Sequence, residues 1–107
     1  MITVNLYYSG VNGNARKFAE EMESSGTADK IRAEKGNVRY EYFFLMKDSE
    51  TVLLIDAWEN QEAIDAHHAS PMMQTITQLR EKYDLHMRVE RFVSADTPKS
   101  ENHFIRR

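Results

Sequence analysis

Residues 56 to 71 read Asp56-Ala57-Trp58-Glu59-Asn60-Gln61-Glu62-Ala63-Ile64-Asp65-Ala66-His67-His68-Ala69-Ser70-Pro71. This stretch holds the only tryptophan, two of the four histidines and one of the two prolines of the chain. It has the pattern of a strand that ends at Trp58 and of a helix that Asn60 caps. A second helix is expected to start at Ser70-Pro71, with Ser as its cap and Pro in its first position. Most of the unusual chemistry of the chain is therefore concentrated here.

The residues before this stretch alternate with the period of β-strands. Strands are predicted over residues 1–9, 38–47 and 51–58, and a turn at 48–50 joins the last two. The two joined strands form an antiparallel hairpin that carries aromatic side chains on both faces. Because neither face can be left to water, one is expected to meet helices and the other a second subunit, which makes the protein a homodimer.

A helical pattern separates the first two predicted strands. Its apolar residues follow the helical period from Asn14, which is the expected N-terminal cap. The run Ser24-Ser25-Gly26-Thr27 predicts a kink or a restart, because these residues disfavour a helix interior. The restarted helix is expected to end at Gly36 as its C-terminal cap.

The residues after Pro71 supply one more helix and one more strand. A helical stripe runs from Met72 to Tyr83, and residues 85–93 alternate as a last strand. The order strand, helix, strand, strand, helix, strand predicts an α+β ferredoxin-like fold with a split βαβ (β-α-β-β-α-β) antiparallel sheet. Residues 1–95 form this domain, and residues 96–107 are expected to be a polar, mobile C-terminal tail.

Composition excludes several classes of function. A chain of 107 residues with a net charge of −3 and scattered Lys and Arg offers no basic surface for nucleic acid or for an anionic membrane. With no cysteine, it can form neither disulfides nor iron–sulfur clusters. The first eight residues contain no basic leader and no long apolar segment, so we expect a cytoplasmic protein.

Several motifs together resemble those of the antibiotic biosynthesis monooxygenase (ABM) family. They lie at the first strand, at the entry of the second strand, at the end of the third, and in the helices that follow. In this sequence they are Met1-Ile-Thr-Val4, Gly36-Asn-Val-Arg39-Tyr40-Glu41, Asp56-Ala-Trp58-Glu59, Glu62-Ala63-Ile64, Ala66-His67 and Ser70-Pro71. The resemblance covers about residues 1 to 94.

The resemblance implies a dimeric α+β barrel with a pocket in each subunit between the sheet and the helices. Members of this family oxygenate phenols, anthrones or quinols without metal or flavin, degrade haem, or isomerise a phosphorylated sugar. Leu54 and Ile64 stand where the best-known antibiotic-tailoring members carry Asn and Tyr. Met72-Met73 replaces a histidine and an aromatic residue, which makes that wall of the pocket apolar and adaptable.

His67 and Asp56 are the candidate catalytic residues. His67 occupies the Ala-His position of the family, and an imidazole suits a base that takes a phenolic proton. The alternative is a structural histidine that bridges helix and strand, in hydrogen-bond contact with Asp56. Asp56 would orient His67 or hold a substrate hydroxyl; as a structural residue it would pair with Arg39 or cap a helix.

The candidate substrate-binding residues surround these two. Leu54, Asp56 and Trp58 share one face of their strand, and Trp58 is either an aromatic wall of the pocket or a core anchor whose indole N–H is satisfied by the backbone. The remaining candidates are Tyr40, Asn5, Ile64, His68 at the rim and Met72. His86 and His103 are isolated and are expected at the surface.

The leading hypothesis is a cofactor-free monooxygenase that uses dioxygen to oxidise a small aromatic substrate of the quinol type. No metal site or phosphate loop is expected, because neither pattern is present. The haem-degrading alternative is weaker. That branch carries a second histidine later in the same helix, and Thr77 stands at about that position here. An isomerase of a small carbonyl compound is a second alternative, for which only Arg39 could supply a cation to a phosphorylated substrate. The third is a non-catalytic dimeric binder of a hydrophobic metabolite.

Overall fold

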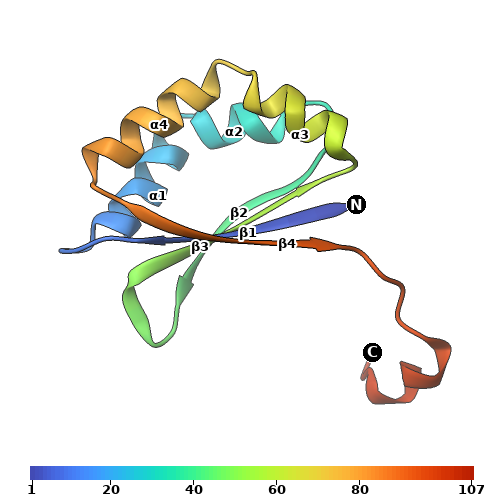
Figure 1. Cartoon of the computed structure of the whole chain (residues 1–107). Helices are drawn as coiled ribbons and strands as arrows, with labels where there is room; N and C mark the ends of the chain where they lie inside the picture. Colours follow the sequence, from blue (N-terminus) through green and yellow to red (C-terminus); the bar gives the residue numbers. More distant parts are fainter.

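The computed structural model describes all 107 residues as a four-stranded sheet with helices on one of its faces (Figure 1). In chain order the elements are β1 (Ile2–Ser9), α1 (Asn14–Ser24), α2 (Thr27–Arg32), β2 (Asn37–Leu45), β3 (Asp48–Trp58), α3 (Gln61–His68), α4 (Met72–Lys82), β4 (His86–Val93) and a short 3-10 helix, η1 (Lys99–Phe104). The strands lie in the order β2-β3-β1-β4, and all neighbours are antiparallel. The predicted ferredoxin-like fold is confirmed.

The register of the sheet separates its two faces. Tyr40 of β2 and Val4 of β1 are the cross-strand partners of Asp56 of β3, so all three side chains point to the helices. Asn5 is paired with Ile55 and points to the opposite face, which no helix covers. Below, this second side is called the open face of the sheet.

The core lies between the sheet and the helical layer. Its largest fully buried side chains include Trp58 and Tyr8 from the sheet and Phe18, Met22 and Ile31 from α1 and α2. The apolar positions of α1 recur at helical spacing, so this helix turns one continuous stripe toward the strands. Burial of these side chains holds the helices over β3 and its neighbours.

The breaks between elements agree with the sequence in some places and differ in others. Helix α1 ends at Ser24 and α2 starts at Thr27, as predicted, and the Asn60 side chain accepts the Ala63 N–H at the start of α3. The turn between β2 and β3 lies at residues 46–47 instead of 48–50. The reason is that Asp48 already belongs to β3, where its carboxylate accepts the Thr51 hydroxyl at 2.7 Å.

Three of the predicted caps are wrong. Asn14 is the first residue of α1, and its amide donates instead to the Tyr83 carbonyl at the end of α4. Helix α2 ends at Arg32, and Gly36 forms the turn into β2 with φ at 85°. Ser70 makes no capping hydrogen bond for α4, and its hydroxyl is buried without a partner.

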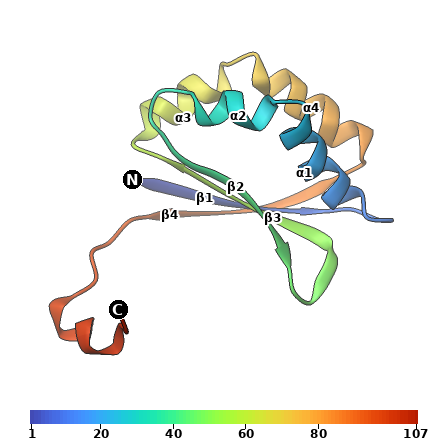
Figure 2. The same cartoon turned by 180° about the vertical axis from the view of Figure 1, so that it is seen from behind.

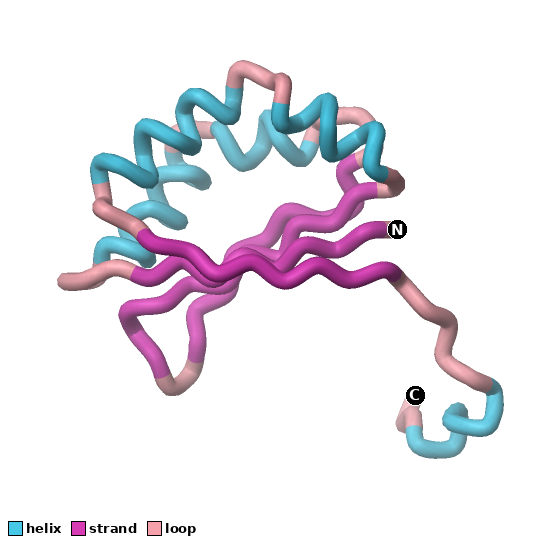
Figure 3. Tube along the Cα trace, in the orientation of Figure 1, coloured by secondary structure: helices cyan, strands magenta, loops and turns pink.

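The two ends of the sheet carry different appendages. Near one end of the sheet the β2–β3 hairpin bends away from the helical layer, and the chain leaves β4 at the other end (Figure 3). From there the C-terminal residues run to the side of the sheet away from the helices (Figure 2). None of the helices has the length and apolar character needed to cross a membrane.

Candidate active site

Asp56 and Trp58 lie at the end of β3, beneath α3. Both side chains point from the sheet to the helices, and only 9% of Asp56 and 1% of Trp58 remain exposed. The Trp58 Nε1–H donates a hydrogen bond to Asp56 Oδ1. The indole is therefore satisfied by a carboxylate and not by the backbone. Nor does Asp56 pair with Arg39, which lies on the open face and bonds Glu41 at 2.9 Å.

The environment of Asp56 keeps its carboxyl group from ionising easily. Burial raises the pKa of Asp56 to about 7, and the nearby Glu34 charge adds to this effect. The hydrogen bond from Trp58 and the positive charge of His68 lower the same pKa without offsetting the burial. A carboxyl group with this pKa exchanges a proton near neutral pH, as a general acid or base requires.

His67 stands against the other side of Trp58. Its ring is buried in α3 and stacks on the indole, with ring centroids 4.8 Å apart and planes inclined by 28°. The Nδ1 atom lies 2.9 Å from Oε1 of Glu34, a mostly buried carboxylate between α2 and β2. The sequence suggested that Asp56 would orient His67; the structure gives that position to Glu34, because the Asp56 carboxylate is engaged by Trp58.

One acceptor atom on each of the two candidate catalytic residues is free. Nε2 of His67 and Oδ2 of Asp56 make no hydrogen bond within the chain. Neither atom is among the polar side-chain atoms that are sealed from solvent without a partner. Each of the two residues therefore keeps one acceptor atom that no group of the chain uses.

The other candidates from the helix-facing side are packed around this group. Tyr40 is buried, its ring centroid lies 6.5 Å from that of His67, and its hydroxyl is 3.3 Å from the Tyr42 hydroxyl. Burial raises the pKa of the Tyr40 phenol well above its ordinary value. Leu54, Ile64 and Met72 belong to the apolar core or pack against it. They shape the site, but they offer no polar contact.

Two candidates lie outside the cluster. His68 is exposed at the rim of α3, with its ring 5.7 Å from that of His67. Asn5 is separated from Asp56 by the sheet itself, because its position in β1 points to the open face. Its Oδ1 atom is buried there without a hydrogen-bond partner.

Arg80 is a polar residue of the interior that the sequence analysis missed. From α4 its Nη2 donates to the Tyr8 hydroxyl at 2.8 Å, and its Nε is buried without a partner. Burial raises the pKa of Tyr8, while the Arg80 charge lowers it. The expectation that Arg39 is the one cation near the pocket is wrong, since Arg39 lies on the open face. The sequence did contain a signal for Arg80: it follows the buried Ile76 by four residues, so it lies on the same side of the helix.

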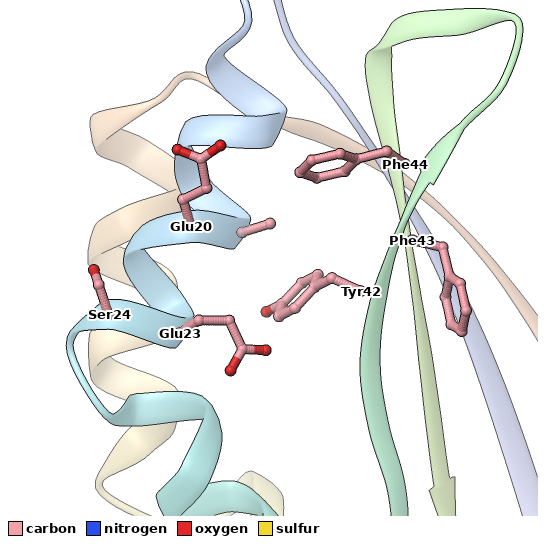
Figure 4. A pocket seen from close by; sticks show the side chains of 7 residues that line it. Glu20, Glu23, Ser24, Tyr42, Phe43 and Phe44 are labelled. Atoms are coloured by element: carbon pink, nitrogen blue, oxygen red, sulfur yellow. The ribbon is translucent and has the colours of Figure 1, made fainter.

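The larger of two described hollows of the surface does not coincide with this cluster. It has a volume of about 710 Å³ and lies between α1 and the end of β2. Tyr42 and Phe44 point across it toward α1, whereas Phe43 points to the far side of the strand (Figure 4). A smaller hollow of about 230 Å³ lies at the start of α3, beside Gly36 and Asn60. No three His, Asp or Glu side chains are arranged to hold a metal ion.

The comparisons with known proteins agree with the fold. The family model described as "Antibiotic biosynthesis monooxygenase" matches residues 1–79. No curated protein gives a significant match.

Solved structures share the architecture at low sequence identity. A proposed antibiotic biosynthesis monooxygenase from Deinococcus radiodurans has a TM-score of 0.78 at 15% identity, over 92% of this chain and 97% of its own. A similar protein from Nitrosomonas europaea has a TM-score of 0.75 at 16% identity, over 88% and 98%. SnoaB, a cofactor-independent oxygenase from Streptomyces nogalater, has a TM-score of 0.74 at 16% identity, over 92% and 96%. At these identities the likeness shows the fold alone.

Proposed function

This chain belongs to the antibiotic biosynthesis monooxygenase family, and from that premise we propose that it is a cofactor-free monooxygenase of a small aromatic substrate of the quinol type. The observation that carries the proposal is that one indole contacts both an imidazole and a carboxyl group: His67 stacks on the Trp58 ring, and the Trp58 N–H donates to Asp56. A quinol presents two hydroxyl groups on one flat ring, and an imidazole and a carboxyl group beside an indole are the groups that can bind such hydroxyls. SnoaB, described as a cofactor-independent oxygenase, has the same fold.

The proposed chemistry begins with loss of a phenolic proton. His67 takes the proton at Nε2, while its Nδ1 is held by Glu34 and the ring is fixed against the indole. The electron-rich anion then reduces dioxygen directly. One oxygen atom forms a new bond to the ring carbon, and the other leaves as water with two hydrogens from the substrate. Because a quinol supplies all the electrons for this step, the reaction needs no separate reductant.

Asp56 has a second role in this scheme. A carboxyl group with a pKa near 7 can accept a hydrogen bond from the second hydroxyl, or return a proton to the reduced oxygen. Trp58 holds Asp56 in place through its N–H and forms the wall between the two acceptors. Tyr40, Leu54, Ile64 and Met72 shape the surrounding apolar wall.

The proposal includes a homodimer that forms through the open faces of two sheets. Leu53, Ile55 and Phe43 lie on this face, which no element of the chain covers. An apolar sheet face of this kind is more stable against a second copy than in water.

An oxygen-electrode assay against a panel of quinols and anthrones tests the function. The purified protein, freed of metal, is compared with His67→Ala, Asp56→Asn and the matched control His86→Ala, whose histidine is exposed on β4. Oxygen uptake that falls about 100-fold in the first two variants and persists in the control is expected. Absence of uptake across the whole panel contradicts an oxygenase, and turnover of a carbonyl substrate without oxygen would point to an isomerase.

A further inference from the structure

The C-terminal tail, residues 96–107, carries an aromatic group that its own chain does not cover. Phe104 is 78% exposed and Ile105 is 40% exposed. At the two ends of η1 the segment bonds only to itself, from Glu101 N to Pro98 O and from Ile105 N to Asn102 O. The tail lies beyond residues 1–79, which match the family model.

The hollow between α1 and β2 has the aromatic and acidic character that complements the tail. Its walls are the rings of Tyr42 and Phe44 and the carboxylates of Glu20 and Glu23 (Figure 4). Phe44 is 48% exposed, although the Arg16 guanidinium covers part of its ring at 4.5 Å. Below, this hollow is called the α1/β2 groove.

Of the two carboxylates in the groove, only one forms an ion pair. Glu23 pairs with Arg32, but Glu20 forms no ion pair within the chain. The tail ends in Arg106 and Arg107, which form none either. An aromatic residue followed by two cations is thus complementary in character to two aromatic rings flanked by a free carboxylate.

We propose that the tail of a second copy of this chain docks in the α1/β2 groove, with Phe104 between Tyr42 and Phe44 and with Arg106 or Arg107 beside Glu20. The volume of about 710 Å³ accommodates a phenyl ring and its neighbouring side chains. β2 is also an edge strand, so its outer backbone groups are free to bond a passing chain.

The topology favours a second copy over the tail's own subunit. The groove borders β2 at one edge of the sheet, whereas the tail leaves β4 at the other edge. The two features also lie at opposite ends of the strands, since Phe44 is next to the hairpin and Val93 pairs with Ile2 at the far end. A two-fold axis that passes between stacked open faces and runs diagonally to the strands brings each tail end toward the other copy's hairpin end, so both tails can dock at once.

Cysteine cross-linking tests this contact directly, because the natural chain contains no cysteine. Full-length Ser24→Cys protein is mixed with affinity-tagged Ile105→Cys protein, subunits are exchanged, and the mixture is oxidised mildly. Ser24 lines the groove, and the matched control Gln78→Cys is exposed on α4. The mixed disulfide with Ser24→Cys is expected to form at least about tenfold faster than that with Gln78→Cys. Equal rates would overturn the proposal.

Two further measurements separate docking in the second copy from other arrangements. Adding Phe104→Ala to the tagged chain should lower the rate of mixed-disulfide formation about tenfold. The sedimentation of the dimer should stay unchanged. This pair of results tests the tail contact separately from the face-to-face dimer proposed above. A double Ser24→Cys, Ile105→Cys chain, oxidised at a series of protein concentrations, should form intermolecular disulfides whose yield falls as the concentration is lowered. An intramolecular disulfide whose yield does not depend on concentration would instead place the tail in its own groove and contradict the proposal.

Discussion

At the scale of single residues, the buried carboxyl group of Asp56 lowers the free energy of unfolding at neutral pH. The pKa of this acid is about 7 in the folded chain and about 3.8 when exposed. Below about pH 4 both states are protonated and no penalty arises. Between pH 4 and 7 the unfolded chain releases the proton while the folded chain retains it, so stability falls as pH rises and is lowest above pH 7.

Asp56→Asn removes this penalty and keeps an oxygen for the Trp58 N–H. We predict that the variant is about 1–3 kcal/mol more stable than the wild type at pH 8, and equal to it within error near pH 4. Urea unfolding at the two pH values measures the difference. A variant that is less stable than the wild type at pH 8 would show that the carboxylate is a net stabilising group. The variant is also expected to lose oxygen uptake, which makes Asp56 a case of stability given up for activity.

Glu34 is the second residue on which a prediction rests. It touches no proposed reacting atom, but it holds Nδ1 of His67 and so directs Nε2. Glu34→Ala is expected to lower kcat roughly 10- to 100-fold with little change in KM, because the histidine loses its orientation while the binding wall stays intact. Glu34→Asp should recover part of kcat. If Glu34→Ala and Glu34→Asp lose the same amount of kcat, the carboxylate is merely structural.

The residues of the site were only partly predictable from sequence. Period-two alternation correctly puts Leu54, Asp56 and Trp58 on one face of their strand, because this depends on local backbone geometry. The bond between Glu34 and His67 spans 33 positions, and that between Arg80 and Tyr8 spans 72. Such partners depend on how the helices cross the sheet, which no local pattern contains.

At the scale of elements, the position of α3 depends on a turn as much as on its cap. Gly36 has φ at 85°, and a Cβ added there would come within 2.6 Å of the Ala63 Cβ in α3. Gly13 has φ at 75°, but a Cβ would meet nothing within 4 Å. Substituting each glycine in turn therefore separates two costs in folding free energy: that of a left-handed backbone in a residue with a side chain, and that of displacing the helix that carries His67.

Gly13→Ala should cost about 1–2 kcal/mol, which is the penalty of the backbone conformation alone. Gly36→Ala should cost about 3 kcal/mol or more, because overpacking against Ala63 is added to that penalty. Chemical denaturation measures both values. Only the second substitution is expected to lower oxygen uptake in the protein that remains folded, since only this one moves α3. Similar effects of the two on stability and uptake would contradict a role for Gly36 in placing α3.

The order and type of the strands and α-helices were predicted correctly, whereas several of their ends were not. Hydrophobic period is a property of whole segments, so a single misplaced residue does not change the prediction. A cap depends on one side chain and its rotamer. Asn14 and Ser70 have the right chemistry to cap, but Asn14 is engaged by α4 and the Ser70 hydroxyl forms no bond. Only Asn60 caps as expected.

At the scale of the whole molecule, the open face of the sheet is the largest feature that a single chain leaves incomplete. The helices cover only one face, and the core is confined to that side (Figure 1). On the other face, Asn5 Oδ1 is already sealed from water without a partner, which is costly in an isolated subunit. A second sheet stacked on this face can cover Ile55 and Phe43.

Ile55→Glu tests this face, because it places a carboxylate at the centre of the proposed interface, opposite Asn5 and Glu41. The substitution should raise the dimer dissociation constant at least about 100-fold, since a buried charge without a partner opposes association. Sedimentation over a range of concentrations would follow the shift from twice the chain mass of 12.5 kDa to the single chain. Thr77→Glu, on the exposed side of α4, is the matched control and should leave the dimer intact. If both variants sediment as dimers, the copies pair through another surface; if the wild type is a monomer at every concentration, the open face has no second copy to cover it.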